Sequence, residues 1–189
     1  MAVSTLWRSH EGKAEAMRGV VDAWHAHVRD GKEVLMLAHE RKDVALLNEA
    51  ARGRLRSDGK LGEDCVIHTE EGSRAFATGD RICFGLRNDE LGVVNGTLGT
   101  VEDIKGSQMV VRLDGDEQRQ IVFDTRDYKH LEHGFASTVH KAQGRTVDDV
   151  VVYAGKYWDR ELAYVAMSRQ RESVQLHWDK ETFQNRGAL

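Results

Sequence analysis

Apolar residues in the first sixty positions follow two different periods, which predict different elements. In residues 13–29 (KAEAMRGVVDAWHAHVR) they recur every three or four positions, which predicts an amphipathic helix. Residues 34–38 (VLMLA) form a continuous apolar run, which is typical of a strand buried on both faces. Residues 40–56 return to helical spacing. Helix, buried strand and helix in this order predict part of a parallel α/β sheet.

The pattern changes near residue 62 to short β-rich runs separated by glycines. Asp114-Gly115-Asp116 is a hairpin turn signal between two of them. The runs are CVIH, RICFG, TLGTVED, QMVVRLDG and QRQIVFD. Five short strands in about sixty residues predict a small antiparallel barrel or meander.

The α/β pattern returns from about residue 134. The sequence predicts a short helix, a buried strand, a helix and a final strand at residues 137–144, 148–153, 159–171 and 173–178. We therefore expect an all-β module inserted into an α/β domain. The first part of that domain is residues 1–74, the module is 75–130, and the second part is 131–189.

Composition narrows the class of protein. The 189 residues carry a net charge of −4, which argues against a surface that binds nucleic acid on every side. The sequence has neither a run of eighteen apolar residues nor a secretory signal, so we expect no membrane association. Cys65 and Cys83 are too few for a disulfide framework, which favours a cytoplasmic location. His130 and His133 lack a supporting C-x-x-C pair, and we predict no metal site.

Two stretches carry candidate chemistry. Residues 134–144 (GFASTVHKAQG) bring hydroxyls, an imidazole and a lysine together with small residues, and such groups hold phosphates. The alternative is a polar helix with Thr138 as N-cap and Lys141 in solvent. Residues 164–172 form the end of a helix with two arginines, of which one could reach a phosphoryl group as an arginine finger. The alternative is that these arginines offset the helix dipole.

Three stretches together resemble one family. They are GDRICFGLRNDELGVVNGTLGTV (79–101), HGFASTVHKAQGRTVDDVVVY (133–153) and RELAYVAMSRQRESVQLHW (160–178). They resemble the C-terminal RecA-like motor domain of RecD-like superfamily 1 DNA helicases, and most of all the helicase part of TraA-type conjugative relaxases. The second stretch is similar to helicase motif V and the third to motif VI. Ala142 and Ser168 depart mildly from those motifs, where Ser and Thr are common.

The resemblance implies a fold and residue roles. The fold is an α/β RecA-like parallel sheet flanked by helices, with an inserted small SH3-like antiparallel β-barrel. Thr138 and His140 match positions that contact the single-stranded DNA backbone, and Lys141 belongs either to the DNA or to the nucleotide. Gln143 and Gly144 lie towards the nucleotide, and Arg169 is the arginine finger that reaches the γ-phosphate. The neighbouring Arg171 is structural.

The implied activity is ATP-driven translocation along single-stranded DNA, in conjugative transfer. The sequence contains neither G-x-x-x-x-G-K-[ST] nor G-x-G-x-x-G, so it cannot hold a nucleoside triphosphate alone by the usual route. ATP and Mg²⁺ are therefore expected to bind mainly to an upstream RecA-like domain of the same parent protein, and the isolated chain is expected to be inactive. Further partners are single-stranded DNA and other conjugation proteins.

A non-catalytic DNA- or partner-binding module of a relaxase is the alternative function. A cleft edge that exposes Arg169 with Gln143 and Gly144 favours the motor. Burial of Arg169 in a salt bridge with Glu172 or Glu161 favours the binding module.

Overall fold

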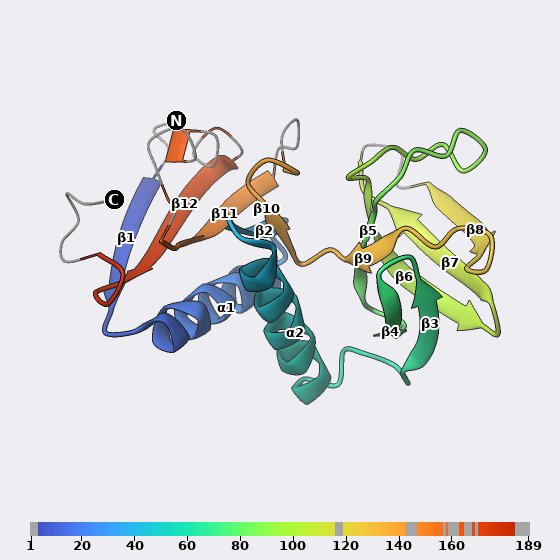
Figure 1. Cartoon of the computed structure of the whole chain (residues 1–189), viewed down its shortest axis with the longest axis horizontal. Coiled ribbons are helices and arrows are strands. Elements are labelled where there is room, and N and C mark those ends of the chain that lie inside the picture. The colour runs from blue at the N-terminus through green and yellow to red at the C-terminus, as the bar shows by residue number, and fades with distance from the viewer. Residues whose placement is uncertain are drawn as a thin grey trace. The chain divides into compact units, whose positions relative to one another are not determined.

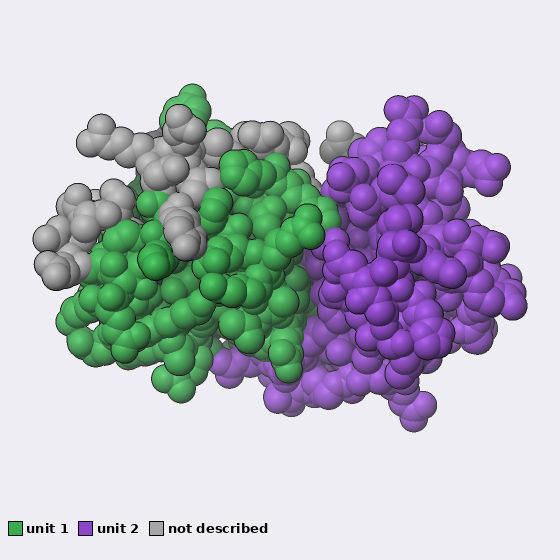
Figure 2. All heavy atoms as spheres, in the orientation of Figure 1, with its two compact units in different colours: residues 1–51, 135–189 green, residues 52–134 purple. Residues whose placement is uncertain are grey.

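The computed structural model describes residues 4–115, 119–142, 147–156, 158, 163–164, 168 and 170–183. The chain forms two compact units (Figure 2). Unit 1 combines residues 1–51 with residues 135–189, and unit 2 is the continuous segment 52–134. Unit 2 thus begins earlier than the inserted module that the sequence places at 75–130.

Unit 1 is built on a five-stranded sheet in which every neighbouring pair is parallel (Figure 1). The strand order is β1-β12-β11-β2-β10. The strands are β1 (Ser4–His10), β2 (Val34–Ala38), β10 (Ala136–Thr138), β11 (Val147–Ala154) and β12 (Gln170–Asp179). Because all five run in the same direction, their carboxyl ends share one edge, where α/β sheets commonly bind ligands.

Helix α1 (Lys13–Arg29) packs against this sheet, as the sequence predicts. Its buried residues Ala16, Val20, Val21 and Trp24 form one stripe. A core cluster that does not include α1 combines alternate residues of three strands with Trp158 and Phe183. Those strand residues are Leu35, Leu37, Val150, Val152, Val174 and Leu176. The sheet is therefore buried on both faces, which explains the continuous apolar runs at 34–38 and 150–152.

Helix α2 (Arg41–Ser57) follows β2 and confirms the helix predicted at 40–56. Leu47 and Ala51 are fully buried. The last residues of the helix, from Arg52 onwards, belong to unit 2. The same helix therefore contributes residues to both units.

Apart from the last residues of α2, the regular elements described in unit 2 are β-strands, as its short glycine-separated runs predict. Strands β3 (Cys65–Thr69) and β4 (Gly72–Phe76) form a two-stranded sheet. A second, antiparallel sheet has the order β8-β7-β6-β5-β9. Its strands are β5 (Arg81–Phe84), β6 (Leu98–Lys105), β7 (Gln108–Leu113), β8 (Gln120–Asp124) and β9 (Leu131–His133). This sheet is an open meander and not the expected closed barrel, because the short strand β9 pairs with β5 alone and β8 is the opposite edge.

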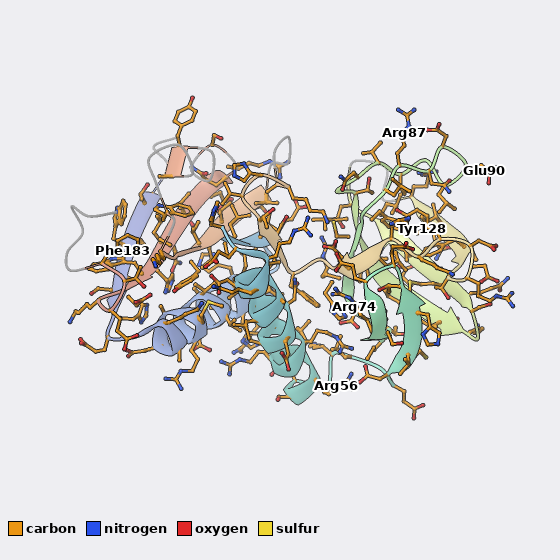
Figure 3. The ribbon with its side chains drawn as sticks, in the orientation of Figure 1. Arg56, Arg74, Arg87, Glu90, Tyr128 and Phe183 are labelled. Atoms are coloured by element: carbon orange, nitrogen blue, oxygen red, sulfur yellow. The ribbon has the colours of Figure 1, made fainter. Side chains whose placement is uncertain are left out.

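Aromatic packing holds the core of unit 2. Phe84, Phe123 and Tyr128 contact one another, with ring centroids 5.5–5.9 Å apart. The Tyr128 hydroxyl donates to the carbonyl of Leu86 (2.5 Å) and accepts from its amide (3.1 Å). This contact fixes the start of the loop between β5 and β6, from which Arg87 and Glu90 project (Figure 3).

Several local predictions differ from the structure. The short helix predicted at 137–144 is wrong where it is described: Ala136–Thr138 is strand β10 and residues 139–142 are turns. Parallel pairing with β2, a long-range contact, decides this conformation. The helix predicted at 159–171 falls mostly outside the described residues. Of those that are described, Ala163 and Tyr164 are helical, and Gln170 already belongs to β12. No helix in the described part of the chain is long and apolar enough to cross a membrane.

Candidate functional site

The candidate site lies where β2 and β10 end, at the carboxyl edge of the parallel sheet. Thr138 pairs with Ala38 in the register of these strands, so the residues that follow each strand come together. The rings of His39 and His140 lie 6.0 Å apart between centroids, with an angle of 67° between their planes. His39 was missed as a site residue from the sequence. Its position directly after a predicted buried strand was the available signal.

Thr138 shapes the turn that presents this site. Its Oγ1 accepts a hydrogen bond from the Lys141 amide (3.2 Å), and its carbonyl accepts one from the Ala142 amide (3.0 Å). A hydroxyl that accepts from the amide three positions later acts as an N-cap does. Thr138 therefore caps the turn as the alternative reading of this stretch, an N-cap, requires, although the turn does not continue as a helix in the described residues.

Buried neighbours direct the polar side chains outwards. Val139 and Ala142 are fully buried in the core of unit 1, and the Val139 amide donates to the carbonyl of Ala38 (3.2 Å). Between them, His140 is exposed and Lys141 is half-buried. The turn thus presents an imidazole and an ammonium group at the sheet edge from a fixed backbone.

A buried polar network lies at the same edge. Lys13 Nζ is 2.6 Å from an oxygen of Asp43, whose side chain is 2% exposed. The Tyr153 hydroxyl donates to Asp179 Oδ2 (3.0 Å). Burial raises the pKa of Tyr153 far above its ordinary value, and the charges of Asp179 and Asp43 raise it further. Tyr153 is therefore neutral at physiological pH.

At the amino ends of the strands, opposite the candidate site, polar side chains gather around Asp149 of β11. Burial favours its neutral form, but hydrogen bonds from Ser173, His27 and Lys32 outweigh burial and lower its pKa. Nearby, Arg171 Nη1 lies 3.2 Å from an oxygen of Asp148. This ion pair fits the structural role that the resemblance implies for Arg171.

The nucleotide-side predictions lie outside the described residues. These are Gln143, Gly144 and Arg169, and with them the question of whether Arg169 is exposed or buried. Within the described ranges, no group of three or more His, Cys, Asp or Glu side chains is arranged to hold a metal ion. His133 Nε2 lies 3.0 Å from the Ala75 carbonyl oxygen, and burial lowers the pKa of this histidine.

Comparisons with known proteins agree with the motifs. Residues 133–176 match the family model of the UvrD-like helicase C-terminal domain. The chain is 40% identical over 178 residues to the conjugal transfer protein TraA of Rhizobium radiobacter, which covers 94% of this chain and 16% of that protein. It is 37% identical over 97 residues to the ATP-dependent DNA helicase Pif1 of Bdellovibrio bacteriovorus, which covers 44% of this chain and 22% of that protein. The chain thus spans a small part of these relatives.

A solved structure shows the same fold. The Pif1 helicase from Bacteroides in complex with ADP-AlF3 and single-stranded DNA aligns with a TM-score of 0.58 at 18% identity, over 87% of this chain and 49% of that one. The recognition made from the motifs is therefore confirmed: the chain contains a region that matches the UvrD-like helicase C-terminal domain, and it is similar over most of its length to TraA conjugal transfer proteins.

Proposed function

We propose that this chain is the second motor domain of an ATP-dependent single-stranded-DNA translocase or helicase of conjugative transfer, and that residues 138–141 contact the DNA backbone. One observation carries the proposal. Exposed His140 and half-buried Lys141 lie on a turn at the carboxyl edge of the parallel sheet, inside the segment that matches a helicase domain.

The groups on this turn suit a phosphate backbone. The Thr138 hydroxyl accepts from the Lys141 amide and can still donate its own proton. His140 adds an imidazole N–H, and Lys141 adds an ammonium group with three donors. Phosphate oxygens are acceptors, and such contacts position a protein on nucleic acid without reading sequence.

ATP and Mg²⁺ are assigned to the parent protein. Since the sequence lacks a phosphate loop and the described residues offer no metal-ligand cluster, the upstream RecA-like domain would hold MgATP. Bound MgATP would supply the free energy of hydrolysis that drives translocation. Gln143 and Gly144 would border the nucleotide, and Arg169 would stabilise charge on the transferring phosphoryl group.

The module in unit 2 is proposed to be an opened SH3-like fold. Its five-stranded meander and the register shift between Val101 and Asp103 in β6 support this assignment, because bulges form the corners at which strands of small barrels bend. Its role in the motor would be to guide the DNA strand.

DNA binding by the chain tests the proposal. Lys141→Ala should weaken binding of a fluorescein-labelled oligothymidylate and reduce the slope of log affinity against log salt by about 0.7, because one phosphate contact is lost. Thr138→Ala combined with His140→Ala should weaken binding by about tenfold with little change in slope, because uncharged groups release few counterions. Lys60→Ala, an exposed lysine in unit 2, is the matched control. Unchanged binding in all variants would contradict the assignment.

The parent protein tests the arginine finger. Arg169→Ala should lower its ATPase rate by at least about a hundredfold, while its affinity for single-stranded DNA is nearly unchanged. Arg171→Ala is the control, since Arg171 pairs with Asp148 at the opposite edge. Weakened DNA binding with normal ATP turnover in Arg169→Ala would instead favour the non-catalytic binding module.

A further inference from the structure

Strand β10 is an edge strand, with β2 on one side only. Its backbone groups alternate in direction: the Phe135 carbonyl accepts from the Met36 amide (3.2 Å), and the Val139 amide donates to the Ala38 carbonyl (3.2 Å). The amide and carbonyl of Ala136 therefore point away from β2. Outward backbone groups of a buried edge need partners, because an unpaired one costs about as much as a lost hydrogen bond.

The side chain of Asn48, on α2, meets these groups. Its Oδ1 accepts from the amides of Phe135 (3.0 Å) and Ala136 (2.9 Å), and its Nδ2 lies 3.4 Å from the Ala136 carbonyl oxygen. One carboxamide thus satisfies both backbone groups of Ala136, as a residue of a neighbouring strand would. Asn48 is 7% exposed, so the contact is shielded from water.

A side chain chosen only for packing would be apolar here. Leu47 and Ala51 on the same helix are fully buried, and Asn48 lies among them with its polar atoms inward. Burial of an amide is unfavourable unless it is hydrogen-bonded. The backbone of residues 135–136 supplies those bonds and accounts for the polar residue.

We infer that Asn48 is a positioning residue for the DNA-contacting turn, an inference that rests on the proposed function. Strand β10 has three residues and three paired positions, so the ladder with β2 holds its register weakly. A slip by one residue would exchange the faces of Ser137 and Thr138 and move His140 away from the sheet edge. Asn48 fixes the register from the other side, immediately before the turn.

Three variants of the full chain test this role. Asn48→Leu removes every hydrogen bond while keeping the branching and the number of heavy atoms of the side chain. Asn48→Asp keeps the acceptor for both amides, but the group that faces the Ala136 carbonyl becomes an oxygen, which can donate to it only when the carboxyl group is protonated. Glu49→Leu places the same new side chain at the neighbouring exposed position and is the matched control.

Two measurements are needed for each variant. The first is hydrogen exchange at the Val139 and Ala142 amides, whose own acceptors, the carbonyls of Ala38 and Thr138, are untouched by the substitution. The second is affinity for a fluorescein-labelled oligothymidylate. Asn48→Leu should accelerate exchange at both amides by about tenfold and weaken DNA binding by about tenfold, since the binding-competent register is less populated. Asn48→Asp, which keeps the acceptor but not the donor, should lie between the wild type and Asn48→Leu in both, and Glu49→Leu should stay within about threefold of the wild type.

The outcomes separate the two proposals. Normal exchange, or faster exchange with unchanged DNA affinity, in Asn48→Leu overturns the positioning role. If the wild-type chain does not bind the oligonucleotide, the proposed function fails, whatever the exchange rates show. If Asn48→Leu does not fold, Asn48→Ser, whose single shorter hydroxyl cannot replace all three hydrogen bonds, is measured instead, and wild-type exchange and DNA affinity in that variant overturn the inference.

Discussion

Protonation of His177 should destabilise unit 1 over a defined range of pH. His177 is 4% exposed, and its Nδ1 lies 3.0 Å from Nε2 of His10, with the two rings stacked. A hydrogen bond between two imidazoles requires at least one unprotonated nitrogen. Gly19 of α1 packs closely on both rings, since a Cβ there would lie 2.7 Å from each.

The magnitude follows from the pKa of His177. Burial lowers it to about 4, and the charges of His10 and Arg8 contribute in the same direction. The unfolded chain has the ordinary value of about 6.5, so between these values the unfolded state binds a proton that the folded state does not. Stability is therefore complete above about pH 7 and falls as the pH decreases. The expected loss between pH 7 and pH 5 is about 2 kcal/mol.

Urea unfolding followed by tryptophan fluorescence measures this loss. All four tryptophans, Trp7, Trp24, Trp158 and Trp178, belong to unit 1, so the signal reports that unit. His177→Asn places an amide where Nδ1 stands and removes the titrating group, so its unfolding free energy should depend on pH about 2 kcal/mol less than that of the wild type. The same pH dependence in the wild type and in His177→Asn would refute the reasoning.

Two further predictions concern helix α2 and unit 2. Arg52→Leu leaves the fully buried Asp80 carboxylate without its bidentate partner and should destabilise unit 2 by about 3–5 kcal/mol. Arg56 is half-exposed, so Arg56→Leu should destabilise it by less than about 1 kcal/mol. Thermal unfolding followed by circular dichroism distinguishes the two variants. Gly53→Ala should raise the free energy of unfolding by about 0.5–1 kcal/mol, because the added methyl meets no atom within 4 Å. Gly99→Ala should lower the free energy of unfolding, because its Cβ would lie 2.5 Å from a side-chain atom of the next strand. A Gly53→Ala variant less stable than the wild type would contradict the first expectation.

The sequence predicted the elements whose stability depends on local spacing and burial. The helix at 13–29 has one apolar stripe, and the strand at 34–38 is apolar at every position, so both were visible. Strand β1 was missed because it is an edge strand with mostly exposed residues and no alternation. Its conformation comes from pairing with β12, far away in the sequence.

The candidate site could be only partly predicted from the sequence, because it too depends on contacts between distant residues. The motif pointed to Thr138, His140 and Lys141, but their small polar surroundings resembled a helix start. Pairing of β10 with β2, and the bonds of Asn48 across 87 and 88 positions, determine the actual backbone. No periodicity encodes contacts between residues so far apart.

The pairing of β1 with β12 also constrains the order in which a nascent chain acquires structure. Residues 52–134 are continuous and make mostly neighbouring-strand contacts, so we expect them to fold soon after they leave the ribosome. Strand β1 emerges before the other described strands, yet its contact between His10 and His177 spans 167 positions, and β12 is the one described strand with which β1 pairs. During synthesis the backbone of β1 therefore stays unpaired until β12 has been made, and we expect Arg8 and His10 near its end to oppose its pairing with other chains, as charged residues on edge strands do.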